Sequence, residues 1–185
     1  MFQVIAICGL KRSGKDTIAD IFESFGGGYT KKNIAGPLKA VCKLLFDFTH
    51  EQLNTDEKDI VDERLNITPR RAMQYIGTDM MQYQLDALLP GCGRTFWIDN
   101  FINKNQHIGK MIIADLRFVH EYKALKEKYG DKLLVIRVVN SKIVDDCAHS
   151  SEQEWKEIPF NVLINNNSTM AWLQKKIAFL YVSIC

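Results

Sequence analysis

The sequence predicts a single α/β domain around a central, mostly parallel β-sheet. A buried apolar run, a glycine-rich turn and a segment of helical periodicity open the chain in that order. Apolar runs and helical segments alternate again after residue 110, which is the pattern of parallel strands joined by crossover helices. With 185 residues and 46% hydrophobic content, the chain can form one substantial core, and no second domain is needed.

The first strand is expected over residues 4–8, and residues 9–17 (GLKRSGKDT) follow it directly. Ile18 and Phe22 then begin a helical pattern. The two glycines of the turn let backbone N–H groups approach phosphate oxygens, and the helix N-terminus adds partial positive charge. Because the Lys15 ammonium can reach β- and γ-phosphates, this segment predicts a binding loop for a polyphosphate.

Asp16 stands where a loop of this kind usually carries a Mg²⁺-binding hydroxyl, and Thr17 follows it. A bare carboxylate beside a triphosphate is repulsive unless a hard divalent cation lies between them. We therefore hypothesise that Asp16, Thr17 or both hold Mg²⁺. The alternative is that Asp16 only caps the helix.

The composition of the chain indicates which class of ligand it binds and in which cellular compartment it is expected. A formal charge of +2 gives no general attraction to nucleic acid, so small phosphorylated ligands fit better. Five cysteines without a C-x-x-C pair indicate a reducing, cytoplasmic environment. No apolar run has membrane-spanning length, and a strand at residue 4 leaves no room for a signal peptide. Anion binding should be local, at Lys11, Arg12, Lys15, Arg70 and Arg71.

Residues 36–105 are expected to be mostly helical. Pro37 opens an apolar-periodic segment, and Thr49 with Gln52 predicts a capping box for the short helix that follows. Further along, Thr68 is expected to cap a helix whose first position is a proline. The apolar periodicity of this helix is interrupted at residue 77, which predicts that two helices meet at residues 77–78.

The last third of the chain predicts the rest of the sheet. Strands are expected over residues 111–114, 133–139 and 160–164, with a helix between the first two that ends at Tyr129. Ser168 or Thr169 is expected to cap a closing helix. The inward face of that helix should consist of its apolar residues Met170, Leu173, Ile177, Leu180 and Tyr181.

Ligands of open α/β sheets gather at the carboxyl ends of strands, so residues directly after apolar runs are candidate site residues. Asp115 follows the run 111–114 and is expected to support Mg²⁺ or orient an acceptor oxygen; its alternative is a helix N-cap. Arg117 can clamp a phosphate bidentately, whereas the competing interpretation is an ion pair with Glu121.

Arg70 and Arg71 lie in the first turn of a predicted helix, where the macrodipole disfavours cations unless an anion is near. Their position therefore favours a bound phosphate over a pair of solvated surface charges. Gln74 lies one turn further and can present its amide to the edge of a base. Residues 149–152 (HSSE) are expected in a flap, and His149 lacks the partner spacing of a zinc site or a catalytic triad.

These segments together resemble the phage and viral deoxynucleoside monophosphate kinases, and the resemblance spans nearly the whole chain. The Gly-Lys-Asp-Thr version of the loop is the one this family carries. The markers are residues 9–17 (GLKRSGKDT), 35–39 (AGPLK), 69–71 (PRR) with Gln74, 77–79 (GTD), Trp97, 115–118 (DLRF) with Glu121, 149–152 (HSSE) and 165–166 (NN).

The resemblance implies a P-loop NTPase three-layer sandwich with a helical acceptor-binding insertion at about 36–105 and a small lid at about 140–158. It implies transfer of the γ-phosphoryl group of ATP to a deoxynucleoside monophosphate, with Mg²⁺ as cofactor. ATP and Mg²⁺ would be held by Arg12, Ser13, Gly14, Lys15, Asp16, Thr17 and Asn166, with Asp115 as a further metal-site residue.

The resemblance also implies an acceptor site, in which Lys15, Arg71, Arg117 and Asp115 take the catalytic roles. The acceptor phosphate would be gripped by Lys11, Lys39, Arg70, Arg71 and Arg117. The nucleoside would lie among Gln74, Gly77, Thr78, Asp79 and Trp97, with Glu121 ordering the sugar, the metal or an arginine, and with Trp97 or a neighbour stacking on the base.

The lid departs from the family pattern, because residues 140–141 are Asn-Ser where Arg-Pro is frequent, which leaves Arg137 or Lys142 as the closing cation. The expected partners are ATP and the monophosphate, without nucleic acid or membrane. A homodimer is compatible, and a viral protein would act in the host cytoplasm. Two rival functions are a kinase of another small phosphorylated acceptor, such as phosphomevalonate, and a non-catalytic nucleotide-dependent switch.

Overall fold

The computed structural model describes residues 2–143 and 153–184. The chain divides into two compact units. The first unit comprises Met1–Ile34 and Ile98–Cys185, and the second comprises Ala35–Trp97. The flap residues 149–152 predicted from the sequence lie outside the described residues. Among the residues that are described, no helix combines the length and the apolar character that crossing a membrane would require.

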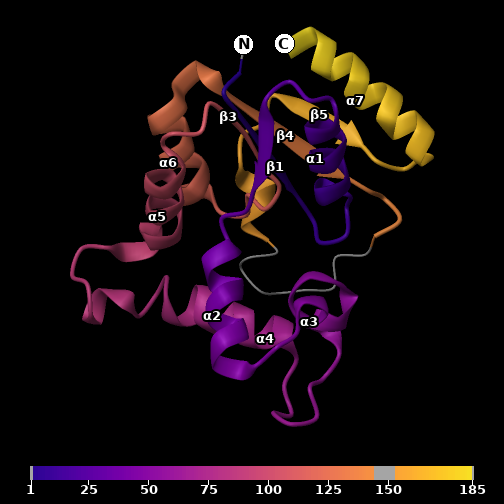
Figure 1. The fold of residues 1–185 in the computed structure, drawn as a ribbon. Helices are drawn as coiled ribbons and strands as arrows, with labels where there is room; N and C mark the ends of the chain where they lie inside the picture. Colours follow the sequence, from indigo (N-terminus) through magenta and orange to yellow (C-terminus); the bar gives the residue numbers. More distant parts are fainter. Residues whose placement is uncertain (1, 144–152, 185) are drawn as a thin grey trace. The chain divides into compact units, whose positions relative to one another are not determined.

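The first unit is built on one parallel sheet (Figure 1). Its strand order is β2-β3-β1-β4-β5, so β1 is central and the order reverses there. Ligands of such sheets bind at this switch point, beyond the carboxyl end of the strand. The strands are β1 (Val4–Gly9), β2 (Tyr29–Lys32), β3 (Lys110–Ile113), β4 (Leu133–Val139) and β5 (Val162–Asn165).

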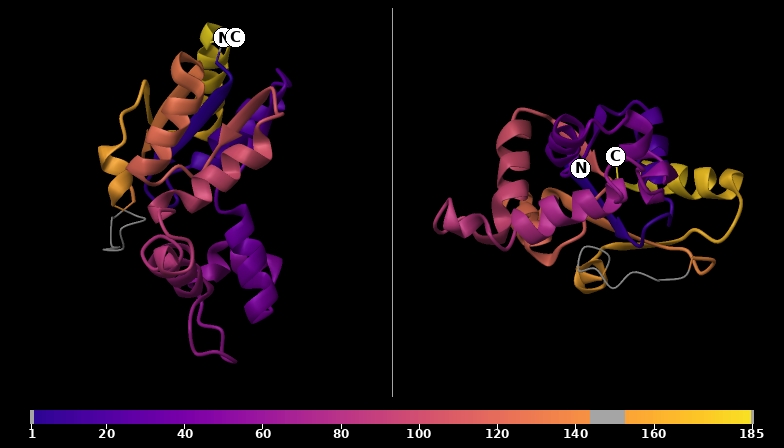
Figure 2. Two further views of the ribbon diagram at one scale, coloured as in Figure 1. Left: turned by 90° about the vertical axis from the view of Figure 1, so that its left-hand side faces the viewer. Right: turned by 90° about the horizontal axis from the view of Figure 1, so that it is seen from below.

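Helices cover both faces of this sheet (Figures 1 and 2). The connections β1–β2 and β3–β4 run in opposite directions across the sheet, so right-handed crossovers place their helices on opposite faces. Ile5 and Ile7 of β1 pack with Ile18 and Phe22 and with the buried Ile177 in one core. The helices of this unit are α1 (Lys15–Ser24), α5 (Phe96–Asn105), α6 (Val119–Tyr129) and α7 (Met170–Ile184), with 3-10 turns η5 (Gly130–Lys132) and η7 (Glu154–Glu157). The first two residues of α5 belong to the second unit.

The second unit is helical. Its core contains Leu38, Cys42, Phe48, Leu53 and Ile76, all buried. Its helices are α2 (Gly36–Phe46), α3 (His50–Asn54), α4 (Pro69–Gln74) and the π-helix η2 (Tyr75–Met80), with 3-10 turns η1 (Asp56–Asp59), η3 (Leu85–Ala87) and η4 (Gly93–Thr95).

Two predicted helix caps are confirmed. The Thr49 hydroxyl accepts from the Gln52 backbone N–H at 3.1 Å, and the Gln52 side chain accepts in return from the Thr49 N–H at 2.9 Å. The Thr68 hydroxyl accepts from the Arg71 N–H at 3.1 Å, and Pro69 opens α4. These caps form because each needs only residues within one helical turn.

The predicted break at residues 77–78 is wrong. The helix continues through these residues as a π-helix, in which each backbone hydrogen bond spans five residues instead of four. The Met81 N–H, for example, donates to the Ile76 carbonyl at 3.1 Å. Gly77 serves packing, because a β-carbon there would lie 2.4 Å from Cδ2 of Leu38 on α2. The glycine therefore allows α2 to approach α4 and η2 closely.

One strand of the sheet differs from the sequence prediction. Strand β2 was not predicted, because a four-residue strand with two lysines carries no apolar run.

Thr169 is the side chain that caps α7, accepting from the Trp172 N–H at 3.3 Å. On α7 Leu173 and Ile177 are buried, and Leu180 and Tyr181 pack against the same core, as predicted. Met170 is 54% exposed, so its predicted inward position is wrong. Met170 is the first residue of the helix, where the chain has only just left the turn.

Candidate active site

Residues 10–14 connect the central strand β1 to α1 and form a cradle of backbone groups. Arg12 at 62° and Gly14 at 101° adopt positive φ in this segment, as does Gly9 at 147° at the end of β1. A β-carbon on Gly9 would lie 2.4 Å from the Val138 carbonyl oxygen, so only glycine fits. Gly14 is the N-cap of α1 and has no side chain to cap it, which leaves the first turn of the helix to bind an anion.

The Lys15 ammonium is hydrogen-bonded to the backbone at the start of this loop. The side chain is buried, and Nζ donates to the carbonyl oxygens of Gly9 at 2.9 Å and Leu10 at 2.7 Å. These bonds fix the positive charge beside the α1 N-terminus. Half-buried Lys11 and exposed Arg12 add two more cations to the same loop. The loop thus concentrates positive charge and N–H donors at one end of β1.

Asp16 and Thr17 lie in the first turn of α1. The Asp16 side chain is 74% exposed, and its Oδ1 lies 3.0 Å from the ammonium of Lys31 on β2. The same ammonium lies 2.8 Å from Oδ1 of Asp20. Burial opposes the charged form of Lys31, but the hydrogen bonds that its ammonium donates to Asp20 and Asp16 outweigh burial and raise the pKa of Lys31. Asp16 is therefore an accessible carboxylate with a cationic neighbour.

Asn166 follows β5 and contacts the loop from the side. Its Nδ2 donates to the Ser13 carbonyl oxygen at 2.9 Å. The buried Ser13 hydroxyl has no hydrogen-bond partner within the described part of the chain. Sequence reasoning assigned both residues to the ATP site, and the structure places them together with Gly14.

Asp115 lies just beyond the carboxyl end of β3. Its Oδ1 accepts from the backbone N–H of Ile34 at 2.9 Å, the residue at which the first unit gives way to the second. Asp115 is not the N-cap of α6, since that position belongs to Phe118. The strand-end position expected for Asp115 is therefore confirmed by β3, whereas its chemical role stays a prediction.

Glu121 of α6 is fully buried and organises the loop before its helix. Its Oε2 accepts from the backbone N–H groups of Arg117 at 2.9 Å and Phe118 at 3.1 Å. Burial raises the pKa of Glu121 to about 7, with the nearby Asp115 charge adding to the shift and the two backbone hydrogen bonds opposing it. Glu121 thus fixes the backbone from which the half-buried Arg117 extends.

In the second unit, the two arginines of α4 have different surroundings. Arg70 is 14% exposed, and its Nε and Nη2 donate to the carboxylate of Asp59. Arg71 is 58% exposed, with Nη1 3.6 Å from Asp79 and its guanidinium 5.9 Å from the Tyr75 ring. The anion that the helix position of Arg70 predicted is supplied by Asp59, whereas Arg71 presents its charge to solvent.

The remaining residues predicted for the nucleoside lie on the π-helix, at the end of α4 and in α5. Thr78 is buried, and the Gly77 carbonyl accepts from Nε1 of the buried Trp97 at 2.9 Å. The indole N–H is thus committed to the backbone of η2. The Gln74 Nε2 atom is buried and has no hydrogen-bond partner among the residues described. Such an orphaned donor is costly unless a ligand satisfies it.

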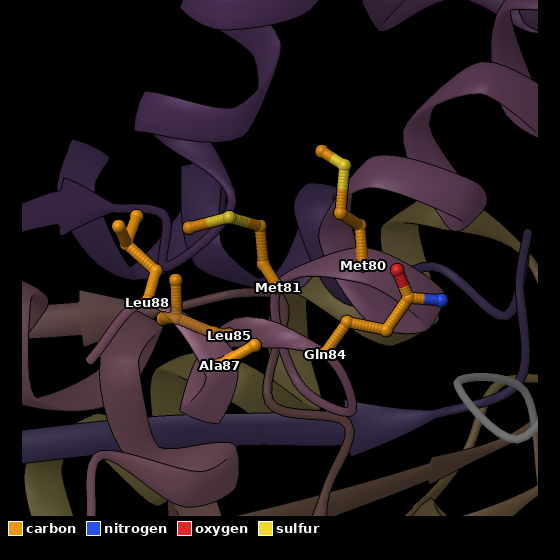
Figure 3. Close-up of a pocket in the computed structure, with 6 residues that line it drawn as sticks. All are labelled: Met80, Met81, Gln84, Leu85, Ala87 and Leu88. Carbon is orange, nitrogen blue, oxygen red and sulfur yellow. The ribbon is translucent and has the colours of Figure 1, made fainter. Parts of the chain in front are cut away.

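The second unit has two further features that concern ligand binding. Lys39 of α2 donates from Nζ to Oδ1 of Asn54 at 2.7 Å. A pocket follows the π-helix along the chain and is lined mostly by apolar side chains (Figure 3). The lining residues are Met80, Met81, Gln84, Leu85, Ala87 and Leu88. None of them carries a charge, so this pocket does not suit a phosphate.

Comparisons with known proteins place the chain in a family. A family model described as deoxynucleotide monophosphate kinase matches residues 45–177. A protein of Acanthamoeba polyphaga mimivirus, provisionally named a deoxynucleotide monophosphate kinase, is 32% identical over 179 residues, which cover 90% of each chain. The chain belongs to the deoxynucleotide monophosphate kinase family.

The fold agrees with this assignment. Dephospho-CoA kinase from Campylobacter jejuni matches with a TM-score of 0.50 at 14% identity, over 100% of this chain and 98% of that one. At this identity the match shows the α/β fold of phosphate-loop kinases alone. As a member of the deoxynucleotide monophosphate kinase family, the protein is a phosphotransferase that acts on a deoxynucleotide monophosphate with ATP as the phosphoryl donor.

For a deoxynucleotide monophosphate kinase, sequence reasoning missed one residue beside the phosphate-binding loop and gave a second residue a different role. Lys31 was missed because β2 lacks an apolar run, although a lysine at the carboxyl end of a strand is a usable signal. Arg137 was considered only as a lid cation. In the structure its Nη2 donates to the carbonyls of Lys156 at 2.9 Å and Ile158, so it anchors η7 to β4. The lid cation itself stays a prediction.

Proposed function

We propose that the loop of residues 9–17 binds the triphosphate of ATP in this deoxynucleotide monophosphate kinase. The observation that carries the proposal is the buried Lys15 ammonium, tethered within 2.9 Å of the Gly9 and Leu10 carbonyls beside an uncapped helix N-terminus. Backbone N–H groups, the helix dipole and Lys15 then share the phosphate charge. Arg12 and Ser13 complete this donor site.

The acceptor phosphate needs several cations to offset its charge. Arg71 is the best placed in the second unit, because its guanidinium is exposed while that of Arg70 is bound to Asp59. Lys11, Lys39 and Arg117 are the further cations that the family resemblance assigns to this phosphate. Arg70 then acts by holding η1 against α4.

Mg²⁺ fits the oxygen donors beside the loop. Mg²⁺ prefers one or two carboxylates together with substrate phosphates and water, so a site of three protein carboxylates is not required. Asp16 offers an exposed carboxylate, Thr17 a hydroxyl on the same turn, and Asp115 a carboxylate at the end of β3. When bound, the ion would neutralise charge on the transferring phosphoryl group.

The nucleoside lies along α4 and η2. Gln74 has the buried amide donor that a base acceptor can satisfy, and Thr78 adds a hydroxyl one turn on. Asp79 orients Arg71 toward the acceptor, and Trp97 supports η2 by donating its indole N–H to the Gly77 carbonyl. Chemistry needs no covalent nucleophile, because the acceptor phosphate is already ionised and only has to be positioned in line.

The test is ADP release with ATP and each common deoxynucleoside and ribonucleoside monophosphate, with phosphomevalonate as a rival acceptor. We expect turnover on at least one deoxynucleotide and a loss of kcat by roughly 10²-fold or more in Lys15→Ala. Turnover confined to phosphomevalonate would replace the acceptor class. A Lys15→Ala variant with unaltered kcat would remove the loop from the mechanism.

A further inference from the structure

Asn166 contacts the phosphate loop from a distant part of the chain. Its Nδ2 donates to the Ser13 carbonyl oxygen at 2.9 Å across a sequence separation of 153 residues. Its own backbone N–H donates to the Val139 carbonyl at 2.8 Å, which fixes the residue on the end of β4. The side chain therefore reaches the loop from a rigid support.

The amide also packs directly on Gly14. A β-carbon at that residue would lie 2.3 Å from Nδ2 of Asn166, which no side chain could tolerate without displacing the amide. Gly14 adopts φ 101°, the left-handed region that glycine favours. Absence of a side chain at residue 14 thus makes room for Asn166 as well as for the turn.

The bond to Ser13 determines which way the next peptide faces. No cis peptide bond occurs in the described chain, and in a trans peptide the C=O and the following N–H point in opposite directions. Because the Ser13 carbonyl points to Asn166, the Gly14 N–H points to the opposite side of this peptide. That N–H is one of the donors that a phosphate-binding loop needs.

We infer that Asn166 is a positioning residue that orients the Ser13–Gly14 peptide so that the Gly14 N–H faces the donor phosphates. The inference rests on the proposed function in one respect, that the loop holds the triphosphate of ATP. It assigns the Asn166 amide to the protein loop, where the sequence had suggested direct contact with ATP. Binding of any polyphosphate should therefore depend on Asn166, whatever base is attached.

The experiment compares two ligands, ATP and inorganic tripolyphosphate, by titration calorimetry on the full chain without acceptor. Asn166→Ala should lower the binding affinity for both ligands by a similar factor, about tenfold, because one oriented hydrogen bond is lost. Asn166→Asp keeps the size of the side chain but replaces the amide donor with a carboxylate that faces the Ser13 carbonyl. This variant should therefore lose more affinity for both ATP and tripolyphosphate than Asn166→Ala does. The KM for the monophosphate should change less than the KM for ATP.

Asn167→Ala is the matched control. The Asn167 Oδ1 accepts from the Ser141 N–H at 2.8 Å, so this neighbour holds the end of β4 and not the loop. Its tripolyphosphate affinity should equal that of the wild type. A loss confined to ATP in Asn166→Ala would show contact with the nucleoside and overturn the inference, as would unchanged affinity for both ligands. A wild-type chain that binds neither ligand would overturn the proposed function itself.

Discussion

The Lys31 ammonium bridges two carboxylates of α1, lying 3.0 Å from Asp16 and 2.8 Å from Asp20. Asp16 is the residue proposed to hold Mg²⁺, so a protein cation already occupies part of its surroundings. Asp20 gives Lys31 a second partner one helical turn away. The position of Lys31 between the two therefore affects how strongly Asp16 can attract a metal ion.

Lys31→Met should lower the Mg²⁺ concentration for half-maximal activity about two- to fivefold, because exposed ion pairs are worth up to about 1 kcal/mol. Asp20→Asn should raise it, since Lys31 then pairs with Asp16 alone. Steady-state rates across a Mg²⁺ titration at fixed ATP measure both. Shifts of the same sign in the two variants would contradict this competition.

Arg70→Ala and Arg71→Ala should separate stability from acceptor binding. Loss of the Arg70–Asp59 pair should lower the free energy of unfolding by about 1–2 kcal/mol, because a charge-assisted bond in a poorly exposed place is broken. Arg71→Ala should leave the melting temperature nearly unchanged and raise the acceptor KM roughly tenfold or more. Urea unfolding measures the stability of both variants, and steady-state kinetics measure their acceptor KM. A stability loss in Arg71→Ala together with a raised acceptor KM in Arg70→Ala would refute the assignment.

Glu121→Gln should alter the pH dependence of stability. The pKa of Glu121 is about 7 in the folded protein, against 4.5 as its ordinary value, so the folded state binds the proton more tightly. The free energy of unfolding contributed by this group therefore falls as pH rises from about 4.5 to about 7. The variant lacks this titration.

The difference between wild type and Glu121→Gln should thus decline across that window, by roughly 3 kcal/mol at most, and be constant at higher pH. Urea unfolding at closely spaced pH values between these limits measures it. Parallel stability curves for the two proteins would show that the carboxyl group titrates normally.

Gly77→Ala should destabilise the second unit by about 1–3 kcal/mol, because its methyl group would collide with Leu38. Leu38→Ala removes the obstacle and leaves a cavity of its own. In the double variant the two costs should therefore sum to less than their separate values. A double-mutant cycle of unfolding free energies measures this coupling, and strict additivity would exclude the contact as the cause.

The sequence by itself determined the local features of this protein. The glycine-rich turn between the first strand and helix, the caps at Thr49 and Thr68 and the strand 133–139 were predicted correctly, because each depends on residues within one turn or one apolar run. The alternation of runs and helices was enough to predict a parallel sheet. Membership of the kinase family also followed from ordered motifs, which the family match confirms.

Only the tertiary structure decided which of these residues meet. Asn166 reaches Ser13, Asp115 receives the Ile34 N–H, and the two partners lie far apart in the chain in both cases. A parallel sheet with order β2-β3-β1-β4-β5 brings the carboxyl ends of distant strands to one edge, and that order cannot be read from local periodicity. The physical reason is that local patterns fix which element forms, whereas packing between elements fixes which hydrogen bonds surround the reactants.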